Sequence, residues 1–208
     1  MYLPSHFRET DLARIAETID AHGFATLVSQ VADAPFATHL PLLFDPEAGE
    51  QGTLYGHFAR GNPQGLEEGA DMLAIFHGPH AFVSPSWYAT PGVPTWNYVV
   101  VHVRGKLRLI PDPAETLALL EALTEKYDPE VADPEGPVMP EEGKLGMLRG
   151  VTAFAIDITS MDAKFKLSQN RSKEDRQRVV AHLGQSDDPA AHALSGLMLE
   201  DLVRDREK

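Results

Sequence analysis

The sequence predicts a mainly β protein of the α+β class, with an antiparallel sheet closed into a barrel and peripheral helices. Three observations support this class. At least six short apolar segments fall within the first 110 residues, separated by turn residues. Strands that follow each other closely through turns favour antiparallel pairing. Helical patterns are inserted irregularly and become more frequent towards the C-terminus, which disfavours a doubly wound parallel sheet.

The predicted strands cover residues 24–30, 34–44, 53–58, 72–77, 81–84, 96–110 and 151–158. Asp45-Pro46 and the glycines at 49 and 52 supply one turn, and Gly78-Pro79 closes the strand over 72–77. Gly105 predicts a bulge or bend within the longest strand, because a glycine inside a strand weakens its regular packing.

Capping residues mark the predicted helix starts. Thr10 is the expected N-cap of a helix that carries an apolar stripe and ends at Gly23. Asn62 followed by Pro63 predicts a short helix, since asparagine caps well and proline suits the first helical position. Asp112, followed by a proline and by Glu115 at the third helical position, predicts a longer helix.

The C-terminal part is predicted to be helical. Ser172 begins one helix that ends near Gly184, and Asp188-Pro189 begins the last one. The acidic, proline-bearing stretch over 128–142 is interpreted as a surface loop rather than a linker between domains. We therefore expect a single domain over residues 1–208, with a helical extension over about residues 172–208.

Composition excludes several classes of function. The chain has no cysteine, so disulfides, thiolate metal sites and cysteine nucleophiles are excluded. No apolar run is long enough to cross a bilayer, and no secretion signal is expected at the start, so we expect no membrane partner and a cytoplasmic location. The net charge of −13 does not support DNA as a partner, although it leaves that partner open.

One segment, over residues 164–178, is locally basic although the net charge of the chain is negative. It contains Lys164, Lys166, Arg171, Lys173, Arg176 and Arg178 against Glu174 and Asp175. Such a segment is as easily a solvated helix face as a binding surface.

Aromatic and polar side chains gather in two neighbouring segments, Phe82–Tyr88 and Thr95–His102. Both tryptophans, Trp87 and Trp96, belong to them, and Pro91 and Pro94 stiffen the loop between. This arrangement suits a flat ligand with polar edges. Aromatic clusters are also common in cores and subunit contacts, so that interpretation stays open.

The sequence contains no recognised metal-binding or catalytic motif. Nine histidines are present, but His77 and His80 flank Gly78-Pro79, and no metal-binding motif accompanies any of them. We therefore predict no dedicated metal site. Neither a nucleophile elbow nor a phosphate-binding loop of the GxxxxGK[ST] type occurs, so no catalytic residue is predicted.

Several sequence blocks occur in an order that resembles the PaiB-like family, described as FMN-binding negative transcriptional regulators. The blocks are residues 1–7 (MYLPSHF), 38–41 (THLP), 56–63 (GHFARGNP), 82–88 with 95–102, and 166–171 (KLSQNR). The resemblance covers nearly the whole chain. It implies an antiparallel FMN-binding split β-barrel, a homodimer, and a flavin in a cleft between the subunits.

The resemblance also implies a set of FMN contacts, to which each residue type brings a suitable group. The start of the helix at Asn62, with Arg60, could anchor the phosphate, and the strand at Thr38 could run along the ring. Lys166, Gln169 and Arg171 could close over the phosphate or ring, fix the next helix, or contact nucleic acid. The candidate residues are Thr38, His39, Leu40, Gly56, His57, Arg60, Asn62, Ser84, Trp87, Trp96, Asn97, Lys166, Gln169 and Arg171.

Three functions remain open at this point. The first is an FMN-binding regulator of the PaiB-like type. The second is an FMN-dependent oxidoreductase that acts on a small substrate, in which the flavin would carry the chemistry. The third is a haem-binding module that uses the same cleft, with one of the histidines as ligand. The sequence names no substrate and does not decide whether the protein is an enzyme.

Overall fold

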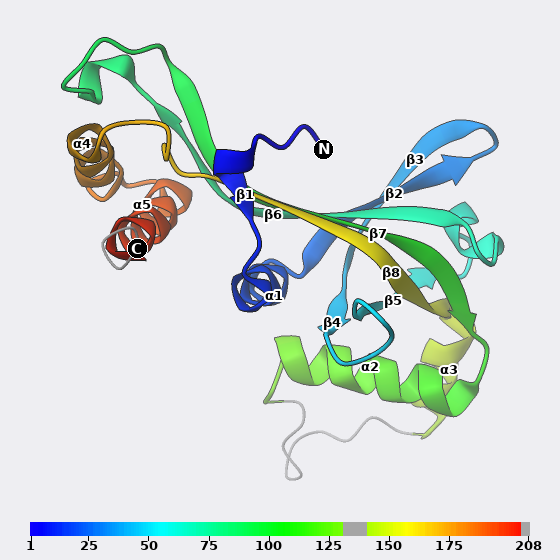
Figure 1. Ribbon diagram of the computed structural model, residues 1–208. Coiled ribbons are helices and arrows are strands. Elements are labelled where there is room, and N and C mark those ends of the chain that lie inside the picture. Colours follow the sequence, from blue (N-terminus) through cyan, green and yellow to red (C-terminus); the bar gives the residue numbers. More distant parts are fainter. Residues whose placement is uncertain (131–140, 205–208) are drawn as a thin grey trace. The chain divides into compact units, whose positions relative to one another are not determined.

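The computed structural model describes residues 1–130 and 141–204 (Figure 1). Chain contacts divide it into two compact units. Unit 1 comprises Met1–Ile15, His77–Val101 and Asp162–Lys208, and unit 2 comprises Ala16–Phe76 and His102–Met161. The strands β6 (Asp71–Val83), β7 (Thr95–Ile110) and β8 (Val151–Lys166) each contribute residues to both units.

The sheet is antiparallel wherever its register is defined. The shorter strands are β1 (Arg8–Glu9), β2 (Phe24–Val31), β3 (Ala34–Pro41), β4 (Leu43–Asp45) and β5 (Thr53–Ala59). Within the described residues the strand order is β3-β2-β6-β7-β8-β5-β4, and β1 pairs with β8. Antiparallel pairing joins β2 to β3 and β6, β5 to β4 and β8, and β1 to β8. The strand order has two ends, so the barrel is split, and the predicted mainly β class is confirmed.

Several helices begin at residues whose side chains cap them, because the first N–H groups of a helix need partners. The α-helices are α1 (Leu12–Ala21), α2 (Pro113–Tyr127), α3 (Glu141–Gly150), α4 (Lys173–Leu183) and α5 (Pro189–Arg204), and the 3-10 helices are η1 (Ser5–Phe7), η2 (Pro63–Leu66) and η3 (Pro85–Trp87). Asp112, Ser172 and Asn62 cap α2, α4 and η2, as predicted.

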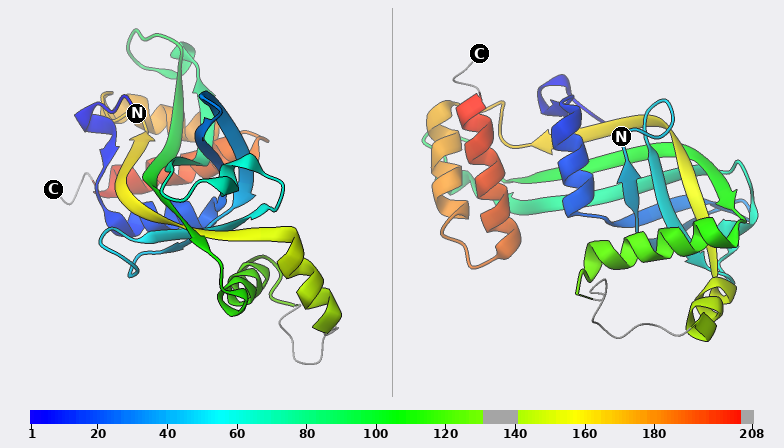
Figure 2. Two further views of the ribbon diagram at one scale, coloured as in Figure 1. Left: turned by 90° about the vertical axis from the view of Figure 1, so that its right-hand side faces the viewer. Right: turned by 90° about the horizontal axis from the view of Figure 1, so that it is seen from below.

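In unit 2 the core lies between the sheet and α2. Leu119 and Leu123 of α2 pack with Ala153 of β8 and against the partly buried Tyr55. Gly105 lies where β7 and β8 approach closely, since a Cβ there would come 2.4 Å from the Asp157 carbonyl oxygen. In unit 1 the helices α4 and α5 lie side by side, and Leu183, Leu194 and Met198 are buried there (Figure 2).

Several predicted boundaries were wrong for identifiable reasons. The Asp11 carboxylate, not Thr10, accepts from the N–H group of Ala13 at 3.1 Å, so Asp11 caps α1. The strand predicted over 34–44 divides at Leu42, whose N–H group donates to the Gly23 carbonyl at 2.9 Å.

Two further strands are longer than predicted. Gly78-Pro79 does not end β6, because Gly78 lets β7 approach closely: a Cβ at Gly78 would lie 2.9 Å from Cβ of Val99. The strand β8 continues from Val151 to Lys166, well past the predicted end at residue 158. Helix α3 was not predicted, and most of the loop expected over 128–142 lies outside the described residues.

Candidate functional site

One face of the strands in unit 1 carries aromatic and basic side chains, of which the two largest apolar ones are exposed. Side chains alternate along a strand, and the odd-numbered residues Val83, Val99 and Phe165 are buried. Even-numbered residues therefore form the opposite face, which we call the platform: His80, Phe82, Trp96, Tyr98, Lys164 and Lys166. Phe82 is 46% and Trp96 is 53% exposed, and their ring centroids lie 6.1 Å apart.

Two cavities open around the platform tryptophan. One of about 340 Å³ is lined by residues of β6 and β7, including His80, Trp96 and Tyr98. The other, of about 500 Å³, is lined by Trp96 and also by Trp87 and His182. Both volumes lie in the range of small-molecule sites, roughly 300–1,000 Å³. The structure thus brings the two predicted tryptophans to one cavity.

Lys164 and Lys166 are held on β8 by neutral groups. The Lys164 ammonium donates to the Tyr2 carbonyl at 3.2 Å and lies 5.3 Å from the Tyr98 ring centroid. The Lys166 ammonium donates to Oγ1 of Thr95 at 2.6 Å and to the Trp96 carbonyl. Burial, together with the nearby Lys164 charge, lowers the pKa of Lys166 below its usual value.

The loop between β6 and β7 is fixed by α4. Ser84 caps η3, and the Trp87 ring stacks on His182 with centroids 4.9 Å apart. The buried Asp175 carboxylate accepts from the Ala89 N–H group at 2.7 Å and from the Thr90 hydroxyl at 2.9 Å. Helix α4 therefore positions the loop that presents Trp87.

Three residues of unit 1 that were predicted to contact FMN interact with other residues of the protein. Asn97 is fully buried and donates to Oγ of Ser168 at 2.8 Å, while its Oδ1 has no partner. Gln169 accepts from the Leu167 N–H group and donates to the Phe165 carbonyl, which shapes the end of β8. The Arg171 guanidinium lies 4.4 Å from the Tyr88 ring centroid.

In unit 2, Thr38 and Asn62 meet in one polar network. The Asn62 side chain accepts from the Gln64 N–H group at 2.9 Å and donates to the Thr38 hydroxyl at 2.8 Å. That hydroxyl donates to Oε1 of Gln64. Gln64 is buried and donates to the Leu27 and Phe36 carbonyls and to the Ser29 hydroxyl. Sequence reasoning missed Gln64, although it follows the recognised Asn62-Pro63 pair.

Arg60 and Gly56 also have structural partners. The Arg60 guanidinium donates to the Leu148 and Val151 carbonyls at 3.2 and 3.1 Å, where α3 ends. Gly56 is required by packing, because a Cβ there would lie 2.7 Å from Cδ2 of Leu42 and 3.0 Å from Cζ of Phe154.

The remaining predicted residues of unit 2 lie on β3 and β5. His39 is exposed, and Leu40 is buried in the core. His57 is half-buried and lines a cavity of about 470 Å³ with Pro41 and residues of α2 and α3. Its Nδ1 is buried without a hydrogen-bond partner, and burial lowers the pKa of the imidazole below its usual value.

Within residues 1–130 and 141–204, no group of three or more His, Asp or Glu side chains is placed to hold a metal ion. No helix in those ranges has the length and apolarity to cross a membrane.

Comparison with known proteins decides the family. Residues 1–160 match a family model described as "Putative FMN-binding domain". The chain belongs to this family. Family membership gives FMN as its cofactor.

A named relative confirms the PaiB-like resemblance. "Protease synthase and sporulation protein PAI 2" of Bacillus subtilis is 36% identical, over 98% of this chain and 99% of the relative. An uncharacterized protein of Saccharomyces cerevisiae is 29% identical, over 65% of this chain and 94% of its own length.

Solved structures confirm the fold. The FAD and haem binding protein from Mycobacterium smegmatis superposes with a TM-score of 0.60 at 19% identity, covering 81% of this chain and 78% of that one. The flavocytochrome Anf3 from Azotobacter vinelandii gives a TM-score of 0.59 at 16% identity, covering 82% and 75%. The predicted split barrel is therefore confirmed.

The platform fits a flavin on physical grounds. Flavin rings are flat, and exposed aromatic side chains beside a cavity provide stacking surfaces for them. FMN also carries a negative phosphate, and cationic side chains favour such a group. Lys164 was not among the predicted contacts, because the predicted strand ended at residue 158 and the alternation of β8 was not extended to it. Tyr98 lies on β7 within the predicted aromatic segment, but it was not chosen as a contact.

Proposed function

We propose that this FMN-family protein binds FMN at the seam of a homodimer, with the platform of unit 1 as one wall of the site. The observation that carries the proposal is the exposure of Trp96 and Phe82 side by side on a strand face. Monomeric proteins rarely leave large apolar side chains clustered in the open, and such patches mark ligand or subunit contacts. Family membership supplies the identity of the ligand.

Each platform group would have a defined task. Trp96 and Phe82 would stack against the ring and exclude water, and the ammonium groups would hold negative charge. When bound, FMN supplies electron-transfer chemistry that side chains lack. The other predicted contacts, including Thr38, Arg60 and Asn62 of unit 2, remain part of this proposal, as does the single domain over 1–208.

We propose that the protein regulates gene expression indirectly, without binding DNA strongly. The PaiB-like family is described as negative transcriptional regulators, and the similar protein of Bacillus subtilis is named "Protease synthase and sporulation protein PAI 2". This similarity supports a regulatory role. The net charge of −13 opposes strong binding to DNA phosphates. We therefore propose a cytoplasmic protein that senses flavin or a small molecule. An FMN-dependent oxidoreductase is the second candidate, and turnover of NADH or NADPH would favour it.

The proposal is tested by FMN titration of the flavin-free protein. We expect one FMN per subunit and an absorption spectrum of flavin, not haem. Trp96→Ala should weaken FMN binding at least tenfold, because the lost stacking and apolar burial together exceed about 1.4 kcal/mol. Phe24→Ala is the matched control, since Phe24 is 65% exposed on β2 of unit 2. Failure of the wild-type protein to bind FMN would refute the proposal, and equal affinity in Trp96→Ala would remove the platform from it.

A further inference from the structure

We propose that Lys164 and Lys166 form an anion-recognition site on the platform, which holds a phosphate or carboxylate group carried by a planar aromatic ligand. This inference rests on the proposed function and names the chemical class that the site takes.

The first argument is the burial of two like charges. Lys164 is only 8% exposed, and Lys166 is partly buried two residues further along the same face of β8. Neither ammonium has a carboxylate within ion-pair distance in the ranges that the structure describes. Buried charges are costly unless they are paired, and two neighbouring cations add mutual repulsion.

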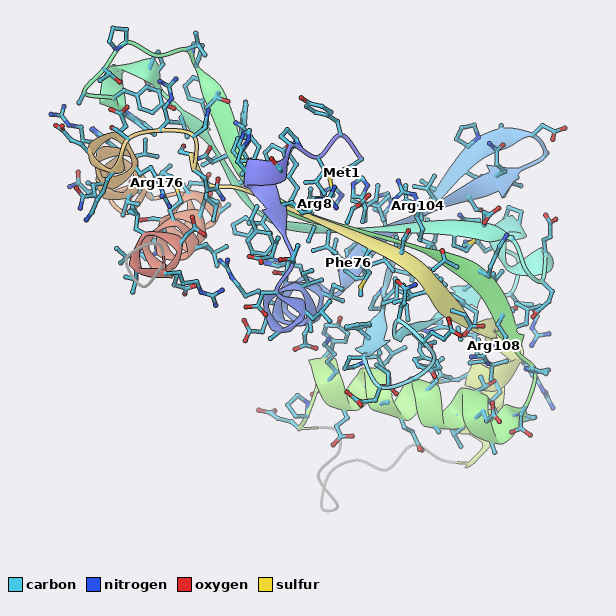
Figure 3. The ribbon with its side chains drawn as sticks, viewed as in Figure 1. Met1, Arg8, Phe76, Arg104, Arg108 and Arg176 are labelled. Carbon is cyan, nitrogen blue, oxygen red and sulfur yellow. The ribbon has the colours of Figure 1, made fainter. Side chains whose placement is uncertain are left out.

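The second argument is the nature of the present partners. Both ammonium groups donate to uncharged oxygens: the Tyr2 carbonyl for Lys164, and Thr95 and Trp96 oxygens for Lys166. These bonds hold the amines in place without neutralising them. Asp162 lies two residues before Lys164, but Arg8 approaches its carboxylate at 3.8 Å. Arg8 is labelled in Figure 3. A local excess of positive charge therefore persists in a protein whose net charge is −13.

The third argument is the aromatic surroundings. The Lys164 ammonium lies 5.6 Å from the Tyr2 ring centroid and 5.3 Å from that of Tyr98, and Tyr98 lines the cavity of about 340 Å³. The Lys166 ammonium donates to the Trp96 carbonyl, and Trp96 is another residue that lines this cavity. Each ammonium group thus contacts a residue that lines the cavity, and this neighbourhood of charge and aromatic surface suits a molecule with a flat ring and a negative group.

Two sources can supply that chemistry. One is the phosphate of FMN itself, and the other is a separate aromatic anion bound beside the flavin. Riboflavin lacks only the phosphate, so the ratio of riboflavin to FMN dissociation constants measures recognition of that group. Benzoate and inorganic phosphate are probes for the second source.

The experiment measures these ligands with the wild-type protein, Lys164→Met and Lys166→Met. If FMN is the source, each variant should lower FMN affinity at least tenfold and leave riboflavin affinity within twofold. If a second ligand is the source, benzoate binding to the FMN-loaded protein should be lost in both variants while FMN affinity is kept. Lys106→Met is the matched control, because Lys106 is 51% exposed and pairs with Asp71.

Other results overturn the inference. It is wrong if both variants bind FMN, riboflavin, benzoate and phosphate as the wild type does. It is also wrong if they become monomeric with unchanged ligand selectivity, since the missing anion would then be a carboxylate of the second copy. Thermal melting and circular dichroism of the variants show that they are folded. If wild-type protein binds no flavin, the proposed function fails, while benzoate and phosphate still test the lysine site.

Discussion

At the scale of single residues, several polar side chains of this protein form hydrogen bonds with its backbone N–H and carbonyl groups. Arg60 donates to two carbonyls at the end of α3, and Gln169 spans two backbone groups at the end of β8. A phosphate at Arg60 would have to share or replace these bonds. His57 differs, because its buried Nδ1 has no partner, and its burial lowers the imidazole pKa.

The shifted pKa of His57 gives a prediction for stability against pH. The folded-state pKa lies below the usual 6.5, so the unfolded chain binds the proton more readily. The free energy of unfolding should therefore fall as pH drops below about 6.5, until the folded state is protonated too. His57→Gln should reduce the slope of stability between about pH 7 and 5, measured by urea denaturation. Burial also lowers the pKa of His22, so part of the slope should remain.

His39→Gln is the control for this measurement, because the His39 side chain is exposed on β3. It shows whether the loss of any histidine has the same effect. A slope in His57→Gln equal to that of the wild type would contradict the assignment to His57.

At the scale of elements, short connections are held by buried polar bonds. The four residues of η2 are joined to β2 and β3 through Gln64, whose amide reaches the Leu27 and Phe36 carbonyls and the Ser29 hydroxyl. A 3-10 helix of this length has little stability of its own. Its position, and that of Asn62, therefore depends on this side chain.

Gln64→Leu should destabilise the protein by about 1–3 kcal/mol, because it leaves buried acceptors without a donor. Denaturation midpoints measure this cost, and hydrogen exchange at residues 62–66 should rise. Gln51→Leu is the matched control, since Gln51 is exposed and makes a single bond, at 3.1 Å, to the Thr159 carbonyl. Equal stability of the two variants would show that the Gln64 network is dispensable.

At the scale of the whole molecule, the platform is the surface that requires a partner in the proposed function. An aromatic face on strands is a frequent subunit contact, whereas isolated exposed apolar residues need no explanation. The Phe82 side chain lies beside Trp96 on that face. Leu199 is also an exposed apolar residue, at 55% exposure, but it lies on α5 outside the platform.

Phe82→Lys should therefore weaken the proposed homodimer at least tenfold, because it would place a charge within a contact that excludes water. Analytical ultracentrifugation measures the dissociation constant. Leu199→Lys, which introduces the same charge on α5, should leave it unchanged. A wild-type protein that stays monomeric at all concentrations, or a Phe82→Lys dimer of normal affinity, would refute the assembly.

The sequence by itself determined the class of the fold, because alternation and capping are local. Strands β2 and β5 and the helices that begin after Asn62, Asp112, Ser172 and Asp188 could be identified from neighbouring residues alone. The order of motifs also indicated the family, and with it the cofactor. Sequence patterns predicted strand boundaries wrongly where contacts between distant residues decide them. Examples are Leu42, whose N–H group donates to the Gly23 carbonyl, and Gly78, which Val99 approaches closely.

Only the tertiary structure decided which candidate side chains meet. It placed Trp87 and Trp96 on one cavity, bonded Thr38 directly to both Asn62 and Gln64, and buried Asn97. It also placed Lys164 beside Tyr98, although 66 positions separate them in the sequence. The reason is physical: pairing and burial depend on strand register and packing across the sheet, which link residues that no local pattern connects.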